Sequence, residues 1–384
     1  MATHFFHSVA TPVAVPNAEP DKRYLFSPAI DFLCLGGSSL IILPLLLLVP
    51  VADHQTQLGA VMLLVAHLVN HPHFAHSYQI FYRGFRTKAF TADLGRNMQL
   101  RYIVSGLVVP IALTGFFAYC LMTGDARLMG YGGNAMALFV GWHYVKQGYG
   151  MLMVDAALKR QYFTAPEKKA LLVNCYAVWI TSWLGFNDYV SEQQLWGLHY
   201  FTFDLPDPIV VAAAAVALAT GATAGWMLLS RWRSTGRLPL NGVVAYAVSL
   251  YVWLLFVGIN PLWGLVVPAL HSIQYMVVVW RFQTNYQKSR RASDYPANSM
   301  VRQVFGSNPL GHLAVFALSA VLLGYIGFWG LPLLLTAVVP HDEIVFGSSL
   351  FLFVGWIFIN VHHYFLDTVM WRRENPDTKR FLFG

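Results

Sequence analysis

The chain has 384 residues, of which 57% are hydrophobic and only 11% are charged, and its mean hydropathy is positive. A soluble globular domain carries about 25% charged residues, so this composition excludes an ordinary soluble domain and indicates a polytopic membrane protein. The formal net charge of +7 does not indicate a nucleic-acid partner, because the basic residues follow the order of the predicted membrane spans.

Ten apolar segments approach the roughly 20 residues that a helix needs to cross a bilayer. In chain order they are 28–50, 57–82, 98–122, 134–158, 170–187, 209–231, 240–258, 262–282, 311–338 and 345–371. The sequence therefore predicts an all-α, polytopic transmembrane helical bundle. The predicted domains are a polar N-terminal tail over 1–27, a transmembrane helical domain over 28–371 that holds a histidine site, and a C-terminal tail over 372–384.

Basic residues gather at alternate connections between the predicted spans. They follow the second, fourth, sixth, eighth and tenth spans, and Lys22 and Arg23 precede the first; Arg127 and Lys146 are the exceptions among the 25. Because Lys and Arg flank the cytoplasmic ends of membrane helices, we expect ten spans with both termini in the cytoplasm. We also expect an integral protein of the bacterial inner membrane.

Histidines inside the predicted spans are the most informative feature of the chain. Eight of the 14 histidines lie in four spans, although ionisable groups in a bilayer are costly and usually face the bundle interior to bind, conduct or catalyse. They are His67, His71, His73 and His76 in the second span, His143 in the fourth, His271 in the eighth, and His362 and His363 in the tenth. A packing role for all eight would require a buried partner for each.

The four histidines of the second span surround Pro72. At about 100° per residue, His67 and His71 share one face of a helix, while His73 and His76 share a nearly opposite face. Proline removes one backbone hydrogen bond and can bend the helix at this point. Either the bend directs both pairs toward one centre, or one pair binds and the other packs or makes hydrogen bonds.

The other three spans place polar side chains on the same helix faces as their histidines. The sets are His143 with Gln147, His271 with Gln274 and Tyr275, and His363 with Asp367. A carboxylate one turn from a histidine can ligate a metal or hold the imidazole tautomer. These partners therefore favour a polar, functional interior over simple helix packing.

Two residues are candidates for catalysis. Lys146 lies inside the fourth span, where an ammonium group needs an anionic or metal-linked partner; it could pair with Asp155, hold a substrate carboxylate or deliver protons. Tyr275 lies one turn after His271 and could donate a hydrogen bond or a proton. We therefore take Lys146 and Tyr275 as the candidate catalytic residues.

Depth in the bilayer favours one shared site. The second, fourth, eighth and tenth spans run in the same direction, and His73, His271 and His363 each lie about ten residues, or roughly 15 Å, from the first basic residue at the cytoplasmic end. His143 lies further from that end, so we expect it at a higher level, closer to that of His67.

Several neutral imidazoles with one or two carboxylates suit iron, copper or zinc. The candidate metal ligands are His67, His71, His73, His76, His143, His271, His362, His363 and Asp367. A haem-binding membrane electron carrier is an alternative, but haem would use two histidines on facing helices and leave at least four unexplained. The other alternative is a metal- or proton-coupled transporter in which the histidines form a relay.

The histidine pattern resembles that of histidine-rich integral-membrane non-haem iron enzymes. The matching features are His67-x3-His71, His73-x2-His76, and His362-His363 with Asp367 nearby. This group includes fatty-acid desaturases and hydroxylases and the bacterial membrane proteins that cleave beta-carotene to retinal. The chain has no HxxHH box, which departs from the desaturase pattern, and its spread of histidines over several helices is closer to the carotenoid-cleaving proteins.

The resemblance implies one or two non-haem irons that act with dioxygen on an apolar, membrane-soluble substrate. The implied reaction is a desaturation, a hydroxylation or an oxidative cleavage. It also implies an electron-donor protein on the cytoplasmic side as a partner. No nucleic acid is expected to bind.

Overall fold

The computed structural model of the protein describes residues 23–48, 51–91, 94–189, 193–195, 198–290, 294 and 299–384. The chain in these ranges is helical apart from a short antiparallel hairpin of β1 (Gln193–Leu195) and β2 (Leu198–Tyr200). The predicted all-α class is therefore confirmed. Most of the predicted N-terminal tail, residues 1–22, lies outside the described residues.

Within the described residues, eight helices are long and apolar enough to cross a membrane. They are Pro28–Leu46, Gln55–Phe81, Arg96–Thr123, Asp207–Thr235, Leu240–Ile259, Trp263–Lys288, Pro309–Val338 and Leu350–Met370. Each coincides with a predicted span, to within a few residues at its ends. The fourth and fifth predicted spans are also continuous helices, α8 (Ala126–Leu158) and α9 (Ala165–Tyr189).

Several of these spans are divided into consecutive helical elements. The divided spans are α1 (Pro28–Phe32) and α2 (Ser38–Leu46), α3 (Gln55–Val65) and α4 (His71–Phe81), α6 (Arg96–Ile103) and α7 (Val109–Thr123), α11 (Leu240–Ala247) and α12 (Trp253–Ile259), and α15 (Pro309–Tyr325) and α16 (Leu331–Val338). The undivided ones are α10 (Asp207–Thr235), α13 (Val267–Lys288) and α18 (Leu350–Met370). Short helices outside the spans are α5 (Phe85–Phe90), α14 (Met300–Phe305), α17 (Glu343–Phe346) and α19 (Pro376–Leu382).

A π-helical turn divides each of the five divided spans. In three of them a proline stands two residues after the turn, namely Pro72, Pro110 and Pro332. Proline has no N–H and its ring clashes with the preceding turn, so the wider turn accommodates it. The turn Ala66–Asn70 directly precedes His71 and thus sets the rotation of α4 relative to α3.

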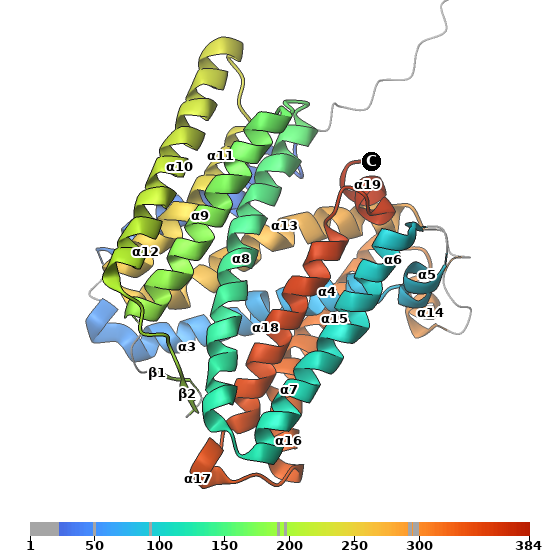
Figure 1. Ribbon diagram of the computed structural model, residues 1–384. Coiled ribbons are helices and arrows are strands. Elements are labelled where there is room, and N and C mark those ends of the chain that lie inside the picture. The colour runs from blue at the N-terminus through green and yellow to red at the C-terminus, as the bar shows by residue number, and fades with distance from the viewer. Residues whose placement is uncertain are drawn as a thin grey trace, which may run out of the picture.

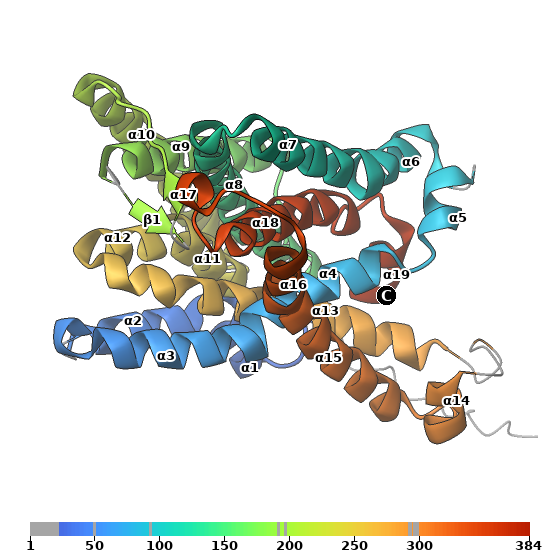
Figure 2. The same cartoon turned by 90° about the horizontal axis from the view of Figure 1, so that it is seen from below.

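Helices α4, α8, α13 and α18 cross near the middle of the molecule. Helices α8, α9 and α10 stand side by side, whereas α3 and α4 run across them (Figures 1 and 2). Helix α18 packs against both α4 and α8, and α13 packs against α4. Buried apolar residues of α18, such as Phe353 and Ile357, fill the space beside this crossing. Residues far apart in the sequence therefore meet where α4, α8, α13 and α18 cross.

Glycines allow α8 to pack very closely against α11 and the π-helical turn Val248–Val252 that follows it. A Cβ atom on Gly148 would lie 2.6 Å from the Cβ of Ser249, and one on Gly242 would lie 2.8 Å from the Cα of Leu152. Small residues at such contacts are typical of helices that associate within membranes. The close packing fixes α8 on one side, so its opposite face is held firmly against α18.

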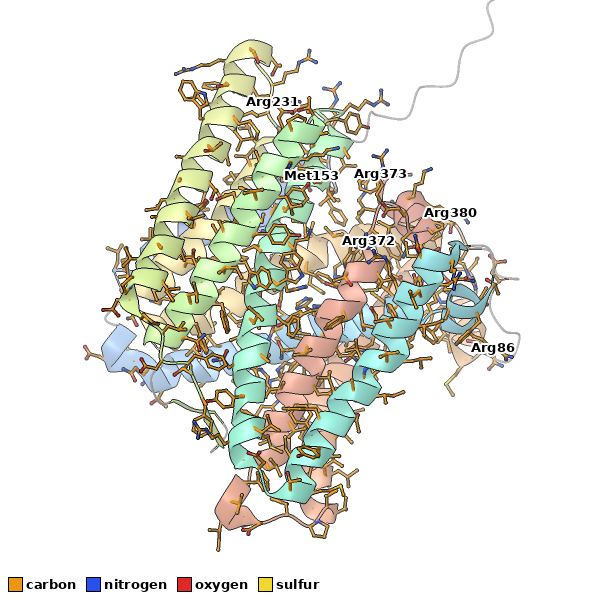
Figure 3. All side chains as sticks on the ribbon, viewed as in Figure 1. Arg86, Met153, Arg231, Arg372, Arg373 and Arg380 are labelled. Atoms are coloured by element: carbon orange, nitrogen blue, oxygen red, sulfur yellow. The ribbon has the colours of Figure 1, made fainter. Side chains whose placement is uncertain are left out.

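Basic side chains gather at one end of the molecule. Figure 3 shows Arg231, Arg372, Arg373 and Arg380 at the upper end and Arg86 at the adjoining right-hand side. Helix α17, which begins after the N-capping residue Asp342, lies at the opposite end (Figure 1). The charge asymmetry read from the sequence is therefore also an asymmetry of the folded molecule.

Candidate metal centre

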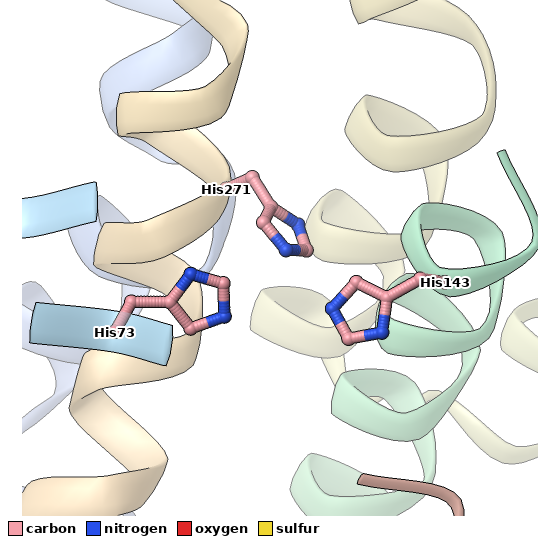
Figure 4. Close-up of side chains that lie close together, drawn as sticks. All are labelled: His73, His143 and His271. Carbon is pink, nitrogen blue, oxygen red and sulfur yellow. The ribbon is translucent and has the colours of Figure 1, made fainter. Parts of the chain in front are cut away.

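One histidine from each of the four crossing helices points into a common space. They are His73 from α4, His143 from α8, His271 from α13 and His363 from α18. The ring centroids of His73 and His363 are 4.6 Å apart, and those of His143 and His271 are 5.0 Å apart. Figure 4 shows the rings of His73, His143 and His271 converging. We call these four residues the histidine cluster.

The nitrogen atoms of this cluster are spaced closely enough to share an ion. One ligand atom each from His73, His143 and His271 lies within 4.8 Å of the others, and the same holds for His143, His363 and Asp367. With metal–nitrogen bonds of about 2.1 Å in a tetrahedral site, neighbouring ligand atoms are about 3.4 Å apart. Shifts of less than an ångström would therefore bring these atoms to bonding distance.

Asp367 adds a carboxylate to the cluster. Its Oδ2 lies 3.5 Å from Nε2 of His363 and 3.9 Å from Nε2 of His143. Its Oδ1 accepts a hydrogen bond of 3.0 Å from the Tyr275 hydroxyl and one of 3.3 Å from the Ser77 hydroxyl. One carboxylate oxygen is thus held by hydroxyl groups, while the other faces the histidines.

The cluster contains buried nitrogens without hydrogen-bond partners. Among the described residues these are Nε2 of His73, Nε2 of His143, and both ring nitrogens of His271 and His363. His73 and His363 are fully buried. A buried polar atom without a partner costs about 1–3 kcal/mol, and folded proteins keep such atoms rare. Six in one place indicate that the cluster is shaped to hold something that they bind.

A hydrogen bond fixes the orientation of the His73 ring. Nδ1 of His73 lies 3.1 Å from the Ser272 hydroxyl oxygen, which is also 2.8 Å from Oδ1 of Asn70 and 2.7 Å from the Pro268 carbonyl. The serine hydrogen can be donated to either of the last two, so Ser272 can accept from Nδ1–H of His73. Nε2 of His73 is then left with a free lone pair directed into the cluster, as a metal ligand requires.

No protein-family model, curated protein or solved structure matches the chain.

Four of the histidines predicted as ligands lie away from the cluster, namely His67, His71 and His76 near Pro72, and His362 in α18. Nδ1 of His67 donates to the Leu63 carbonyl at 2.8 Å, and Nδ1 of His76 lies 2.8 Å from Oε1 of Gln79. The ring of His71 stacks on Phe328, with 4.3 Å between ring centroids. Neither of the two arrangements considered for the histidines around Pro72 is found, because His73 alone of the four points inward and the other three face different neighbours.

His362 is also turned away from the cluster, although it is adjacent to His363. Nε2 of His362 donates to the Ser105 carbonyl at 3.0 Å, and its Nδ1 accepts from the Tyr78 hydroxyl at 2.9 Å. Both ring nitrogens are therefore occupied. Successive residues of a helix point about 100° apart, so only one member of the pair can face the cluster.

Of the two candidate catalytic residues, the structure brings Tyr275 to the cluster and leaves Lys146 outside it. Nζ of Lys146 lies over the rings of Trp142 and Tyr149, at 5.1 and 5.3 Å from their centroids. The suggested pairing with Asp155 is not formed, because Asp155 pairs with Lys159 at 2.9 Å. Lys146 thus lies on the α9-facing side of α8, away from the cluster.

His143 does not lie at the higher level that its position in the sequence predicted. Its ring centroid is 5.0 Å from that of His271 and 6.3 Å from that of His73. The cause is the crossing of the helices: α4 runs across α8 (Figure 1), so counting residues from the basic ends does not measure depth equally in the two helices.

Some residues that build the site carried no usable signal in the sequence. Ser272 was not singled out, yet it holds His73 in place. Trp371 donates to the Tyr275 hydroxyl at 3.3 Å from just beyond the end of α18. The ring of Phe74 packs against both His73 and His363, at 4.7 Å from each. Serine and aromatic residues are common in membrane helices, so only the folded structure identifies these three.

An apolar cavity of about 600 Å³ lies beside the cluster. It is enclosed by α4, α7, α18 and the helical pair α15–α16, and its lining includes His71, Phe74, Phe117, Phe328 and Phe358. This volume is within the range of about 300–1,000 Å³ that is usual for small-molecule sites. Phe74 lines the cavity and also contacts the rings of His73 and His363, so it lies between the cavity and the histidine cluster.

Proposed function

We propose that the histidine cluster and Asp367 bind a redox-active metal ion, non-haem iron, and that the protein oxidises an apolar, membrane-soluble substrate with dioxygen. The observation that carries this proposal is the convergence of four buried histidines whose facing nitrogens lack hydrogen-bond partners among the described residues. Packing alone would leave six buried polar atoms unsatisfied. A bound cation would satisfy those that face it.

The ligand set supports iron more than the other metals. Several imidazoles with one carboxylate suit iron, and copper or zinc also accept such ligands. The two possible ligand groups share His143, which supports one ion per chain. The close contact of four rings supports an ion over haem, because a porphyrin needs open space between two facing histidines. Bound at this site, the metal would supply the redox chemistry that activates dioxygen.

The chain's own groups would hold the ligands and manage protons. The Ser272 hydroxyl keeps the lone pair of His73 Nε2 directed at the centre. The Tyr275 hydroxyl holds a proton against Oδ1 of Asp367 and is itself in contact with Ser77 at 2.6 Å. Tyr275 is therefore the group placed to donate or accept a proton beside the carboxylate. Burial of all these residues excludes water from the reacting groups.

The apolar cavity supports a lipid-like substrate. Its lining residues Leu323, Ile326 and Leu331 are themselves half-exposed on the outer surface of the helical bundle, so the cavity reaches the surface that would face lipid. A substrate dissolved in the membrane could enter there without crossing water. Oxidative cleavage needs no further reductant, whereas desaturation or hydroxylation would need an electron donor. An electron-donor protein would bind at the basic end of the molecule.

We propose further that all ten predicted segments cross the bacterial inner membrane and that both termini are cytoplasmic. Support comes from the gathering of Arg231, Arg372, Arg373 and Arg380 at one end in Figure 3. Positive residues flank the cytoplasmic ends of membrane helices. In this orientation Trp371 lies toward the cytoplasmic end, and its hydrogen bond to Tyr275 connects that end to Asp367.

The proposal is tested by metal analysis of purified protein, with two variants of the same helix. We expect about one iron per chain in the native protein, loss of that iron in His73→Ala, and retention in His76→Ala, because His76 already bonds to Gln79. A native protein without metal after purification in iron-supplemented medium would contradict the proposal and favour a transporter. A Soret absorbance band would favour a haem carrier.

A further inference from the structure

The cavity beside the cluster has walls that are almost wholly apolar. Its lining comprises His71, Phe74, Ala75, Tyr78, Thr114, Phe117, Ala118, Leu121, Met129, Leu323, Gly324, Ile326, Gly327, Phe328, Leu331, Pro332, Leu335, Leu350, Phe351, Val354, Gly355, Phe358 and Ile359. Only three of these side chains can form hydrogen bonds. None carries a full positive charge in the way that a lysine or arginine does.

His71 is the unpartnered member of these three polar side chains. Its Nδ1 is buried without a partner, and its side chain is only 6% exposed. The Thr114 hydroxyl already donates to the Pro110 carbonyl at 2.8 Å, and the Tyr78 hydroxyl donates to His362 at 2.9 Å. Of the polar side chains in the described cavity wall, His71 is therefore the one that can still hydrogen-bond to a ligand.

The His71 ring is also held rigidly. It stacks on Phe328 with an interplanar angle of 12°. A Cβ atom on Gly324 would lie 2.8 Å from the Cβ of His71, so α15 packs directly onto this part of α4. The backbone of His71 is thus held against α15 and its ring against Phe328. A fixed, buried and unpartnered polar group is a recognition feature, because it rejects ligands that leave it unsatisfied.

We infer that the cavity binds a neutral, apolar molecule that carries an uncharged oxygen function, a hydroxyl or a carbonyl, and that this oxygen hydrogen-bonds to His71. This inference rests on the proposed function, since it names the substrate class of the same site. A neutral imidazole offers one donor and one acceptor, so it can serve either oxygen type. A carboxylate or phosphate is disfavoured, because the cavity would bury its charge without a partner.

The helix geometry also sets the orientation of this molecule. His71, Phe74 and His73 lie at about 0°, 300° and 200° around α4. His71 thus faces the cavity, His73 faces the cluster, and Phe74 lies between them, in ring contact with His73 and His363. The oxygen function would be held at His71 while the hydrocarbon lies against Phe74. The carbons next to the Phe74 ring, and not the oxygenated end, are then the ones presented to the metal centre.

Native mass spectrometry of the protein in lipid nanodiscs tests the inference through binding alone. The probes are a long-chain primary alcohol, the ketone, the alkane and the fatty acid of equal carbon number. We expect the alcohol and ketone to bind about three- to tenfold more tightly than the alkane, as one buried hydrogen bond allows, and the fatty acid at neutral pH to bind less tightly than the alcohol. Equal binding of alcohol and alkane would overturn the inference.

Three variants locate and assign the effect. His71→Phe keeps an aromatic ring against Phe328 and should abolish the preference for the alcohol, while His71→Gln should restore part of it. Ala75→Phe fills the cavity and should weaken the binding of alcohol and alkane alike. A preference that survives in His71→Phe would refute the assignment. Iron content is measured on the same samples, and its retention in His71→Phe separates a failure of this inference from a failure of the metal site.

Discussion

The histidines inside the membrane helices form two groups that differ in hydrogen bonding more than in burial. Members of the histidine cluster are buried and present nitrogens without protein partners. His76 and His362 are nearly as buried, at 1% and 2% exposure, but each is bonded to a neighbouring side chain or carbonyl. The hydrogen bonding of the ring nitrogens thus distinguishes the histidines that can bind a ligand from those that pack between helices.

The adjacent pair His362 and His363 gives the largest contrast. His363→Ala should lower iron affinity by more than about 100-fold, because it removes a ligand where loss of even a supporting partner costs about 10–100-fold. His362→Ala should keep the iron but destabilise the fold by about 1–3 kcal/mol, since two buried hydrogen bonds are lost. Iron content after dialysis against a chelator, and thermal unfolding of both variants, measure the two effects.

Loss of iron from both variants with equal destabilisation would contradict the assignment of His363 as a ligand and His362 as a packing residue. That outcome would mean that metal content follows folding and says nothing about ligation. The reverse assignment, iron kept in His363→Ala and lost in His362→Ala, would place the metal on the Tyr78 side of α18 and contradict the cluster.

The sequence was sufficient for the helices but not for the way in which they cross. Apolar length predicted the eight helices of membrane-spanning length that the structure describes, because bilayer thickness sets that length. It also identified His73, His143, His271, His363 and Asp367 among the candidates. It could not tell which histidines of α4 face inward, because that depends on the rotation introduced by the π-helical turn Ala66–Asn70; Pro72 indicates that the helix is disturbed there but does not fix the direction in which the following residues point.

A smaller effect is expected at Ser272, which supports a ligand without touching the proposed metal. Ser272→Ala removes the acceptor for His73 Nδ1 and frees the ring to rotate, so iron affinity should fall by about 10–100-fold. Ser249→Ala is the matched control, since Ser249 is also buried and its side chain hydrogen-bonds to Gln274 at 3.4 Å and not to a histidine of the cluster. Iron titrations that give the same affinity for both variants would show that the Ser272 bond does not position His73.

The smallest effect is expected at Lys146, which sequence reasoning singled out for catalysis. Its ammonium group lies over Trp142 and Tyr149 on the side of α8 that faces α9, while His143 on the same helix faces the cluster. Lys146→Met should therefore leave iron content and the rate of substrate oxidation within about twofold of native. It should lower stability by about 0.5–1 kcal/mol through loss of the cation–π contacts, which Lys146→Arg should largely preserve. A drop in oxidation rate at unchanged iron content would instead mean that the α9-facing side of α8 takes part in the reaction. The absence of hydrogen-bond partners at buried nitrogens would then not be enough to identify the residues of the site.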